Sequence, residues 1–281
     1  PVPELTEALG AERVTSRAID RHALAHDASH FRLIPRAVVR PDTLAEVART
    51  LEVCDRHGLA LTFRSAGTSL SGQAVTDQIL VDTRRGFRAV TVLDEGRRVR
   101  VQPGATVRSV NLRLAPYGRR LGPDPASEGT CTVGGVVANN SSGMQCGTTQ
   151  NAYRTLESLV LVLPDGGVLD TAAPGAADDL ARTRPDLHAG LLGLRERIRA
   201  NPDSVATLER QYAIKNTMGY GLNAFLDHDD PLDILAHLVV GSEGTLAFVV
   251  EATFHTVELL AHRSTCLLVF DDLAAAVGSV T

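Results

Sequence analysis

The chain has 281 residues, of which 44% are hydrophobic and 22% are charged, and its formal net charge is −5. That length can bury one large core or two smaller ones, so the composition excludes a disordered chain. Acidic and basic residues are interspersed, and no apolar run could cross a bilayer, so we expect neither a nucleic-acid partner nor a transmembrane segment. The N-terminus lacks a basic segment followed by an apolar core, and we expect a cytoplasmic protein.

Residues 1–34 are expected to form a helical segment ahead of the main fold. Here His22, His26 and His30 recur at every fourth residue, so a continuous helix would place them on one face as candidate metal ligands. Residues 27–29, Asp-Ala-Ser, instead favour a turn or cap, and a solvated helix end is the preferred interpretation. The four cysteines lack C-x-x-C spacing. We therefore expect no metal site.

A β-α-β unit is expected next. Residues 37–39 read as a strand, and the apolar spacing over 44–57 predicts a helix. Thr43 and Glu46 have the spacing of a capping box, and Gly58 is a typical helix stop. The apolar run 59–63 then predicts a second strand.

This strand leads into Arg-Ser-Ala-Gly-Thr-Ser-Leu-Ser-Gly, residues 64–72, which is a loop of small residues and hydroxyls. Glycines admit close approach of a ligand to the backbone, and successive N–H groups suit phosphate oxygens, so the loop could cradle a pyrophosphate. A Gly/Ser-rich hairpin turn is the competing interpretation. The loop has neither the lysine of a Walker A motif nor the G-x-G-x-x-G pattern of a Rossmann fold.

The remainder of the chain alternates between apolar runs and turn residues. Strands are predicted at 79–82, 89–93, 98–102, 156–163, from 168, at 247–254 and at 264–270. Helices are predicted at 107–114, 187–199 and 271–280. Residues 172–184 read as a loop or weak helix, and Asn-Pro-Asp at 201–203 breaks the helix before it.

Six motifs occur in a fixed order along the chain. They are 64–72, Pro-Asp-Pro-Ala-Ser at 123–127, Cys-Thr-Val-Gly-Gly at 131–135, Asn-Asn-Ser-Ser-Gly at 139–143, Lys-Asn-Thr-Met-Gly-Tyr at 215–220 and Gly-Ser-Glu-Gly-Thr-Leu at 241–246. Together they resemble the FAD-binding domain of the vanillyl-alcohol-oxidase/PCMH family. The run at 215–220 is most similar to the branch of FAD-linked D-2-hydroxyacid dehydrogenases, which act on D-lactate, glycolate or D-2-hydroxyglutarate and often continue into an iron–sulfur domain.

The resemblance implies an α+β fold in which the flavin lies between two α/β lobes. The implied divisions are an N-terminal helical segment at 1–34, one FAD-binding lobe at 35–150, a second at 151–258, and the start of a ferredoxin-like substrate cap at 259–281. In relatives the cap supplies the substrate-binding and catalytic groups. The catalytic residues are therefore expected after Thr281, with Lys215 and Tyr220 as weak candidates within the chain.

The resemblance also implies which residues bind FAD. Those expected around the pyrophosphate are Arg64, Ser65, Ala66, Gly67, Thr68, Ser69, Leu70, Ser71, Gly72 and Gln73. Those expected along the flavin and ribityl side are Pro123, Asp124, Ser127, Gly129, Thr132, Gly134, Gly135, Ala138, Asn139, Asn140, Ser141 and Gly143. Those expected at the adenine or ribityl portion are Glu243, Gly244, Thr245 and Val249.

Thr68 stands where covalently flavinylated relatives have a histidine, so the FAD is expected to be non-covalent. The implied function is an FAD-dependent oxidoreductase that oxidises a D-2-hydroxy acid to the 2-oxo acid. Its electron acceptor would be an iron–sulfur domain, a quinone or an electron-transfer flavoprotein. Two alternatives stay open, a non-catalytic FAD-binding subunit of a larger oxidase and another oxidase of the same fold.

Overall fold

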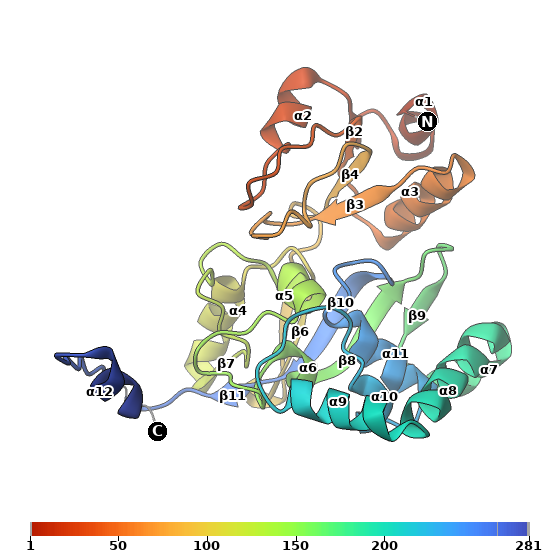
Figure 1. The fold of residues 1–281 in the computed structure, drawn as a ribbon. Coiled ribbons are helices and arrows are strands. Elements are labelled where there is room, and N and C mark those ends of the chain that lie inside the picture. Colours follow the sequence, from red (N-terminus) through yellow and green to blue (C-terminus); the bar gives the residue numbers. More distant parts are fainter. Residues whose placement is uncertain (1, 263, 280–281) are drawn as a thin grey trace.

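The computed structural model of the chain describes residues 2–262 and 264–279. Its N-terminal part is built on a four-stranded sheet in the order β1-β2-β4-β3 (Figure 1). Strands β2, β4 and β3 are parallel, whereas β1 runs antiparallel to β2. The elements of this part are α1 (Val2–Leu9), β1 (Val14–Thr15), α2 (Ala18–Ala23), β2 (Ala37–Val39), α3 (Leu44–Arg56), β3 (Leu61–Arg64) and β4 (Ile79–Asp82).

Helix α3 confirms the β-α-β prediction and its capping residues. The Thr43 hydroxyl accepts a hydrogen bond from the Glu46 N–H, and the Glu46 carboxylate accepts one from the Thr43 N–H. Gly58 follows the helix with a φ of 58°, a left-handed conformation that suits glycine. Val53 and Cys54 are buried on the face of the helix that packs in the first core.

The second sheet has five strands in the order β5-β6-β10-β8-β9, and every neighbouring pair is antiparallel. Its strands are β5 (Val90–Leu93), β6 (Arg98–Val101), β8 (Leu156–Val162), β9 (Val168–Asp170) and β10 (Phe248–His255). The sheet therefore joins β5 and β6, from the range 35–150, to β8–β10, from the range 151–258. The backbone of the chain passes from the first sheet to the second between β4 and β5.

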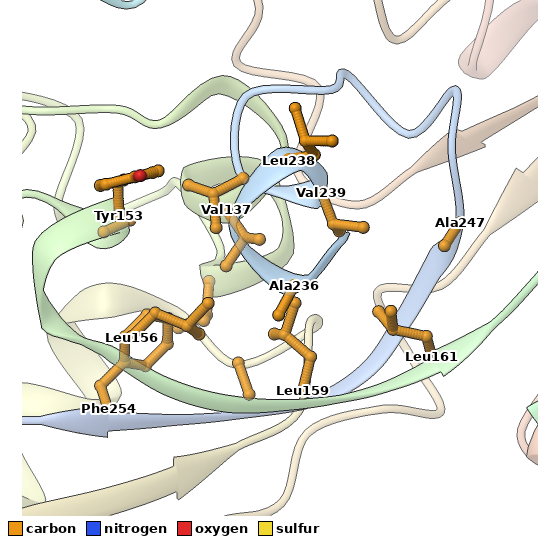
Figure 2. Packing of buried hydrophobic residues seen from close by; sticks show 14 of the residues in the cluster. Val137, Tyr153, Leu156, Leu159, Leu161, Ala236, Leu238, Val239, Ala247 and Phe254 are labelled. Atoms are coloured by element: carbon orange, nitrogen blue, oxygen red, sulfur yellow. The ribbon is translucent and has the colours of Figure 1, made fainter. Parts of the chain in front are cut away.

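Helices cover the second sheet and complete its core. They are α4 (Val107–Leu114), α5 (Val133–Asn139), α6 (Ala152–Thr155), α7 (Ala176–Thr183), α8 (Pro185–Arg199), α9 (Pro202–Tyr212), α10 (Ala224–Asp227) and α11 (Pro231–Val239). Figure 2 shows α11 lying over the sheet, with Ala236 and Val239 in the same buried cluster as Leu159, Leu161 and Phe254. Two short 3₁₀ turns, Asp94–Gly96 and Ala115–Tyr117, and a small pair of strands, β7 (Arg119–Arg120) with β11 (Val257–Glu258), complete this part.

Two predictions in the middle of the chain need refinement. The range 172–184, read as a loop or weak helix, contains α7. The break at 201–203 does end α8, but it also begins a helix that the sequence analysis missed, α9. Asn201 caps α9 by accepting a hydrogen bond from the Ser204 N–H, and Pro202 occupies the first turn, where a missing N–H is harmless.

The N-terminal histidines do not share one helix, because α2 ends at Ala23. Within the described residues no group of three or more His, Cys, Asp and Glu side chains could hold a metal ion. None of the helices in the described part of the chain has the length and apolar character of a bilayer-spanning segment.

At the C-terminal end, the strand predicted at 264–270 is wrong, because these residues form no strand. A strand needs a neighbour to accept its ladder hydrogen bonds, and in the described part of the chain none pairs with this segment. The helix predicted at 271–280 is α12 (Leu273–Gly278), and Val280 lies outside the described residues. Figure 1 shows α12 apart from both sheets.

An aromatic cluster joins the two sheets. The ring of Phe63, on β3, lies 4.7 Å from that of Phe248, on β10, and the ring of Phe87 meets Phe248 edge-on at 5.3 Å. Val47 of α3 and Val162 of β8 are fully buried in the same cluster. The contact between the first and second sheets is therefore a hydrophobic core of its own.

Replacing Phe248 with alanine should destabilise the protein by about 3–5 kcal/mol, because a buried ring is lost and the cavity left between two rigid sheets cannot collapse fully. Urea denaturation measures the change. The matched control is Phe270→Ala, at a ring 39% exposed, which should cost less than about 0.5 kcal/mol. Equal losses in both variants would contradict this role for Phe248.

Candidate functional site

A cavity of about 380 Å³ opens where the loop after β3 meets helix α5 and the turn before β10. A second cavity of about 510 Å³ lies beside it, between β3 and the ends of β8 and β10. Both cavities are lined by Phe63, Gln73, Glu243, Gly244, Ala247 and Phe248. The two spaces are therefore neighbours, and together they suit an elongated ligand.

Most of the residues predicted to form a site line the first cavity. They are Arg64, Ser65, Ala66, Gly67, Thr68, Ser69, Leu70, Ser71, Gln73, Ser127, Thr132, Gly134, Gly135, Ala138, Asn139, Ser141, Glu243, Gly244 and Val249. Thr245 lines the second cavity. Six predicted residues line neither cavity: Gly72, Pro123, Asp124, Gly129, Asn140 and Gly143.

The loop after β3 presents unused backbone donors to the first cavity. In the described part of the chain, the N–H groups of residues 66–70 donate no hydrogen bond. The Ser69 hydroxyl, in contrast, is already engaged, because it bonds to the Gln73 side chain and accepts from the Ser71 N–H. A run of free N–H groups in a glycine-containing loop favours an anion.

Arg64 lies beneath this loop and is 8% exposed. Its guanidinium donates to the carbonyl oxygens of Leu24 and Ala74, each at 3.2 Å. Burial lowers the pKa of Arg64, and the nearby charges of Asp27 and Asp82 oppose that shift. Residue 67 has a φ of 71°, which favours glycine, and a Cβ there would lie 2.5 Å from the Arg64 guanidinium and would displace it. The cation is thus held directly under the free donors.

Two hydroxyl groups in the cavity wall are buried without partners. They are the Oγ of Ser65 and the Oγ1 of Thr132. A buried hydroxyl that makes no hydrogen bond costs free energy, so both atoms indicate that a polar ligand completes the site. Gly135 adds an open stretch of wall, since a Cβ there would meet only the Thr132 Oγ1 within 4 Å, at 3.9 Å.

Asp124 supports the wall from outside the cavity. Its Oδ1 accepts hydrogen bonds from the N–H groups of Gly143 and Cys146, and its Oδ2 accepts one from that of Gln145. A Cβ on Gly143 would lie 1.8 Å from the Asp124 carbonyl oxygen, which excludes any side chain there. Asp124 and Gly143 therefore shape the loop behind the wall.

Glu243 is the carboxylate in the wall, and Arg64 is the only other charged residue that lines the first cavity among the described residues. The Asn139 amide donates to Glu243 Oε1 at 2.7 Å, and the Ser141 hydroxyl donates to Asn139 Oδ1 at 2.9 Å. Burial raises the pKa of Glu243, and the bond from Asn139 partly opposes the rise. This relay connects the turn before β10 to the end of α5.

Lys215 and Tyr220 lie in the loop between α9 and α10, at the rim of the site. The Lys215 ammonium donates to the Ser142 carbonyl oxygen at 3.2 Å. The Tyr220 hydroxyl bonds to Thr245 Oγ1 at 2.8 Å. Neither residue lines the two cavities.

The sequence analysis missed several residues of the wall. They are Phe63, Ala74, Thr83, Pro103, Cys131, Val136, Val239, Ser242, Ala247 and Phe248. Four of them lie at or beside strand or helix ends that flank the predicted loops: Phe63, Val239, Ala247 and Phe248. Their closeness in sequence to those loops could have identified them as wall residues. Pro103 and Thr83 come from segments that only folding brings to the site.

Comparison with known proteins finds relatives in sequence and in fold. The family profile described as FAD binding domain matches residues 35–172. The D-2-hydroxyglutarate dehydrogenase of Haemophilus influenzae is 28% identical over 94% of this chain and 26% of its own length. The glycolate oxidase subunit GlcD of Bacillus subtilis is 25% identical over 99% of this chain and 49% of its own length.

Among solved structures, an alkyldihydroxyacetonephosphate synthase superposes with a TM-score of 0.60 at 18% identity, covering 93% of this chain and 41% of its own. That likeness shows a shared fold. The chain spans about a quarter to a half of the length of these curated relatives.

The glycines at the start of α5 offer a matched pair of substitutions. Gly134→Ala should destabilise the protein by about 1–3 kcal/mol, because the new Cβ would lie 2.6 Å from the Pro103 Cβ. Gly135→Ala should stabilise it by up to about 1 kcal/mol, because alanine is the better helix former and meets no neighbour closer than 3.9 Å. Urea denaturation without ligand measures both changes, and the same sign for the two would contradict the packing described.

Glu243→Gln should raise the melting temperature at neutral pH. A raised pKa in the folded state means that Glu243 contributes its stability below the ordinary value of 4.5 and loses it as the pH rises through the folded value. Glutamine stays neutral and can still accept from Asn139, so the gain over wild type should vanish below pH 4.5. Melting curves across pH test this, with Glu7→Gln on exposed α1 as the control. A pH-independent difference would be evidence against it.

Proposed function

We propose that residues 35–172, which match the family profile described as FAD binding domain, form an FAD-binding domain of the vanillyl-alcohol-oxidase/PCMH type, and that the chain holds FAD in the two neighbouring cavities. The observation that carries the proposal is the run of free N–H groups at 66–70 above the buried Arg64 guanidinium. Such a cradle suits the dianionic pyrophosphate, because hydrogen bonds to a charged acceptor are stronger than those between neutral groups. The unpartnered hydroxyls of Ser65 and Thr132 also fit a polar ligand.

The residues that would hold the cofactor fall into three groups. The loop at 65–71 would bind the pyrophosphate, with Arg64 supporting it from below. Gly134 and Gly135 would let a flat ring lie against the backbone of α5. Glu243, held by Asn139, would face the ligand from the turn before β10.

We further propose that the chain is the FAD-binding part of a dehydrogenase that oxidises a D-2-hydroxy acid to the 2-oxo acid. Support comes from relatives named D-2-hydroxyglutarate dehydrogenase and glycolate oxidase subunit, which match along most of this chain. Bound FAD supplies the acceptor for a hydride from the substrate carbon that bears the hydroxyl. The chain's own residues position that acceptor and exclude water from its buried face.

Three finer points belong to the same proposal. The FAD is non-covalent, because residue 68 is a threonine and offers no imidazole for a flavin bond. The electrons pass on to an iron–sulfur domain, a quinone or an electron-transfer flavoprotein. The protein works in the cytoplasm.

Residues 259–281 are proposed to open the substrate cap. In the described part of this range, Leu267, Val269 and Leu273 are each at least 80% exposed. Apolar side chains that find no cover within this chain would be buried by further elements of a cap domain.

Adding FAD to the purified protein should produce the visible absorbance of bound oxidised flavin, and acid precipitation should release all of the chromophore to the supernatant.

Gly135→Ala should weaken FAD binding about tenfold or more, since its methyl group would occupy space in the cavity wall, although the variant without ligand is the more stable one. Equilibrium titration of flavin fluorescence gives both affinities. Flavin that stays with the precipitate would contradict non-covalent binding, and a wild-type protein that binds no FAD would overturn the proposal.

A further inference from the structure

Lys215 is the only lysine in the chain, and the other 27 of its 28 Lys and Arg residues are arginines. Arginine and lysine differ chemically, because the guanidinium is a wide planar fork whereas the ammonium is a compact point charge with three donors. All the other Lys and Arg positions of the chain are arginines. The single lysine therefore marks a place where a compact cation suits the binding of a ligand. That place is the rim of the proposed FAD site.

Side-chain hydrogen bonds connect the loop that carries Lys215 to the walls of the site. The Lys215 ammonium donates to the carbonyl oxygen of Ser142, the residue after Ser141 in the wall. Five residues on, the Tyr220 hydroxyl bonds to Thr245, and the Tyr220 carbonyl oxygen accepts from the Tyr212 hydroxyl at 2.8 Å. The loop is therefore held against the site, and the exposed Lys215 side chain reaches the wall through its bond to Ser142.

The Lys215 charge has no acidic partner. Within the described residues, no carboxylate lies within ion-pair distance of its ammonium, whereas many of the arginines form ion pairs. Only one hydrogen bond of the ammonium is made, to a neutral carbonyl, so two N–H donors stay available. This leaves a positioned, uncompensated cation beside the cavity.

We propose that the Lys215 ammonium binds the carboxylate of the hydroxy acid substrate at the rim of the site. The inference rests on the proposed function, because it assigns a residue to the substrate of that reaction. A fixed ammonium with two free donors can bond a carboxylate oxygen while it keeps its bond to Ser142. The contact would orient the substrate through its charged end and would select acids over neutral alcohols.

The single lysine makes a direct test possible. An N-hydroxysuccinimide acetate ester will modify one ε-amine in this protein, and mass spectrometry of the peptide that contains residue 215 gives the rate of acetylation. With FAD present, D-lactate should slow the acetylation of Lys215 in a saturable way. D-lactamide and 1,2-propanediol, which lack the carboxylate, should leave the rate unchanged.

Two outcomes of that experiment would overturn the inference. One is an acetylation rate that no D-2-hydroxy acid changes while the flavin spectrum shows that FAD is bound. The other is equal protection by D-lactate, L-lactate and acetate, which would indicate attraction of any anion. A protein that shows no bound flavin at all would instead count against the proposed function, and absorbance measured before acetylation separates the two failures.

Two variants separate substrate binding from a purely structural role. Lys215→Gln can still donate to the Ser142 carbonyl but has no charge, so it should keep the melting temperature and the flavin spectrum. It should weaken D-lactate binding, measured from perturbation of the flavin absorbance, by about tenfold to a hundredfold, the factor typical of a hydrogen bond to a charged group. Lys215→Arg should recover part of that loss. Wild-type affinity in Lys215→Gln would overturn the inference.

Discussion

The contact between Phe63 and Phe248 joins the first sheet to the second beside both cavities. Phe63 is one residue before the end of β3, and the loop at 65–71 follows that strand directly. Phe248 is the first residue of β10, and the turn that carries Glu243 precedes it. Because the two rings pack 4.7 Å apart, the loops that flank them must face each other across one space. The hydrophobic contact between the sheets is thus also what brings the two sides of the cavity together.

The chemistry of that space depends more on backbone than on side chains. Free N–H groups at 66–70 lie in the loop that lines the first cavity, while Arg64, the one cation in that wall among the described residues, donates through Nη1 to two carbonyl oxygens. Burying an arginine is costly unless polar partners and acidic groups are near, and here Arg64 Nη1 bonds to the Leu24 and Ala74 carbonyl oxygens and the charges of Asp27 and Asp82 lie nearby. Such an arrangement of backbone donors favours an anion.

Rigid support behind the walls keeps this arrangement in place. Behind the wall, Asp124 accepts hydrogen bonds from three N–H groups of one loop. Within the wall, Asn139 links Glu243 to Ser141. The rim differs, because the loop with Lys215 and Tyr220 is held by individual side-chain bonds and leaves a charged group exposed.

The sequence by itself determined the local elements and the identity of the loops. The Thr43–Glu46 capping box, the apolar runs of β3, β4 and β8, and the motifs that resemble an FAD-binding domain could all be read directly, because they depend on neighbours a few residues away. Segment 264–270 was misread for the converse reason, since a strand pattern without a partner makes no strand. Only the tertiary structure decided that β5 and β6 pair through β10 with β8 and that Pro103 and Thr83 join the wall. Only the tertiary structure also showed that Asp124 holds a loop behind the cavity wall by hydrogen bonds. The strand pairing, the wall residues and this role of Asp124 all depend on packing between segments that are distant in the chain.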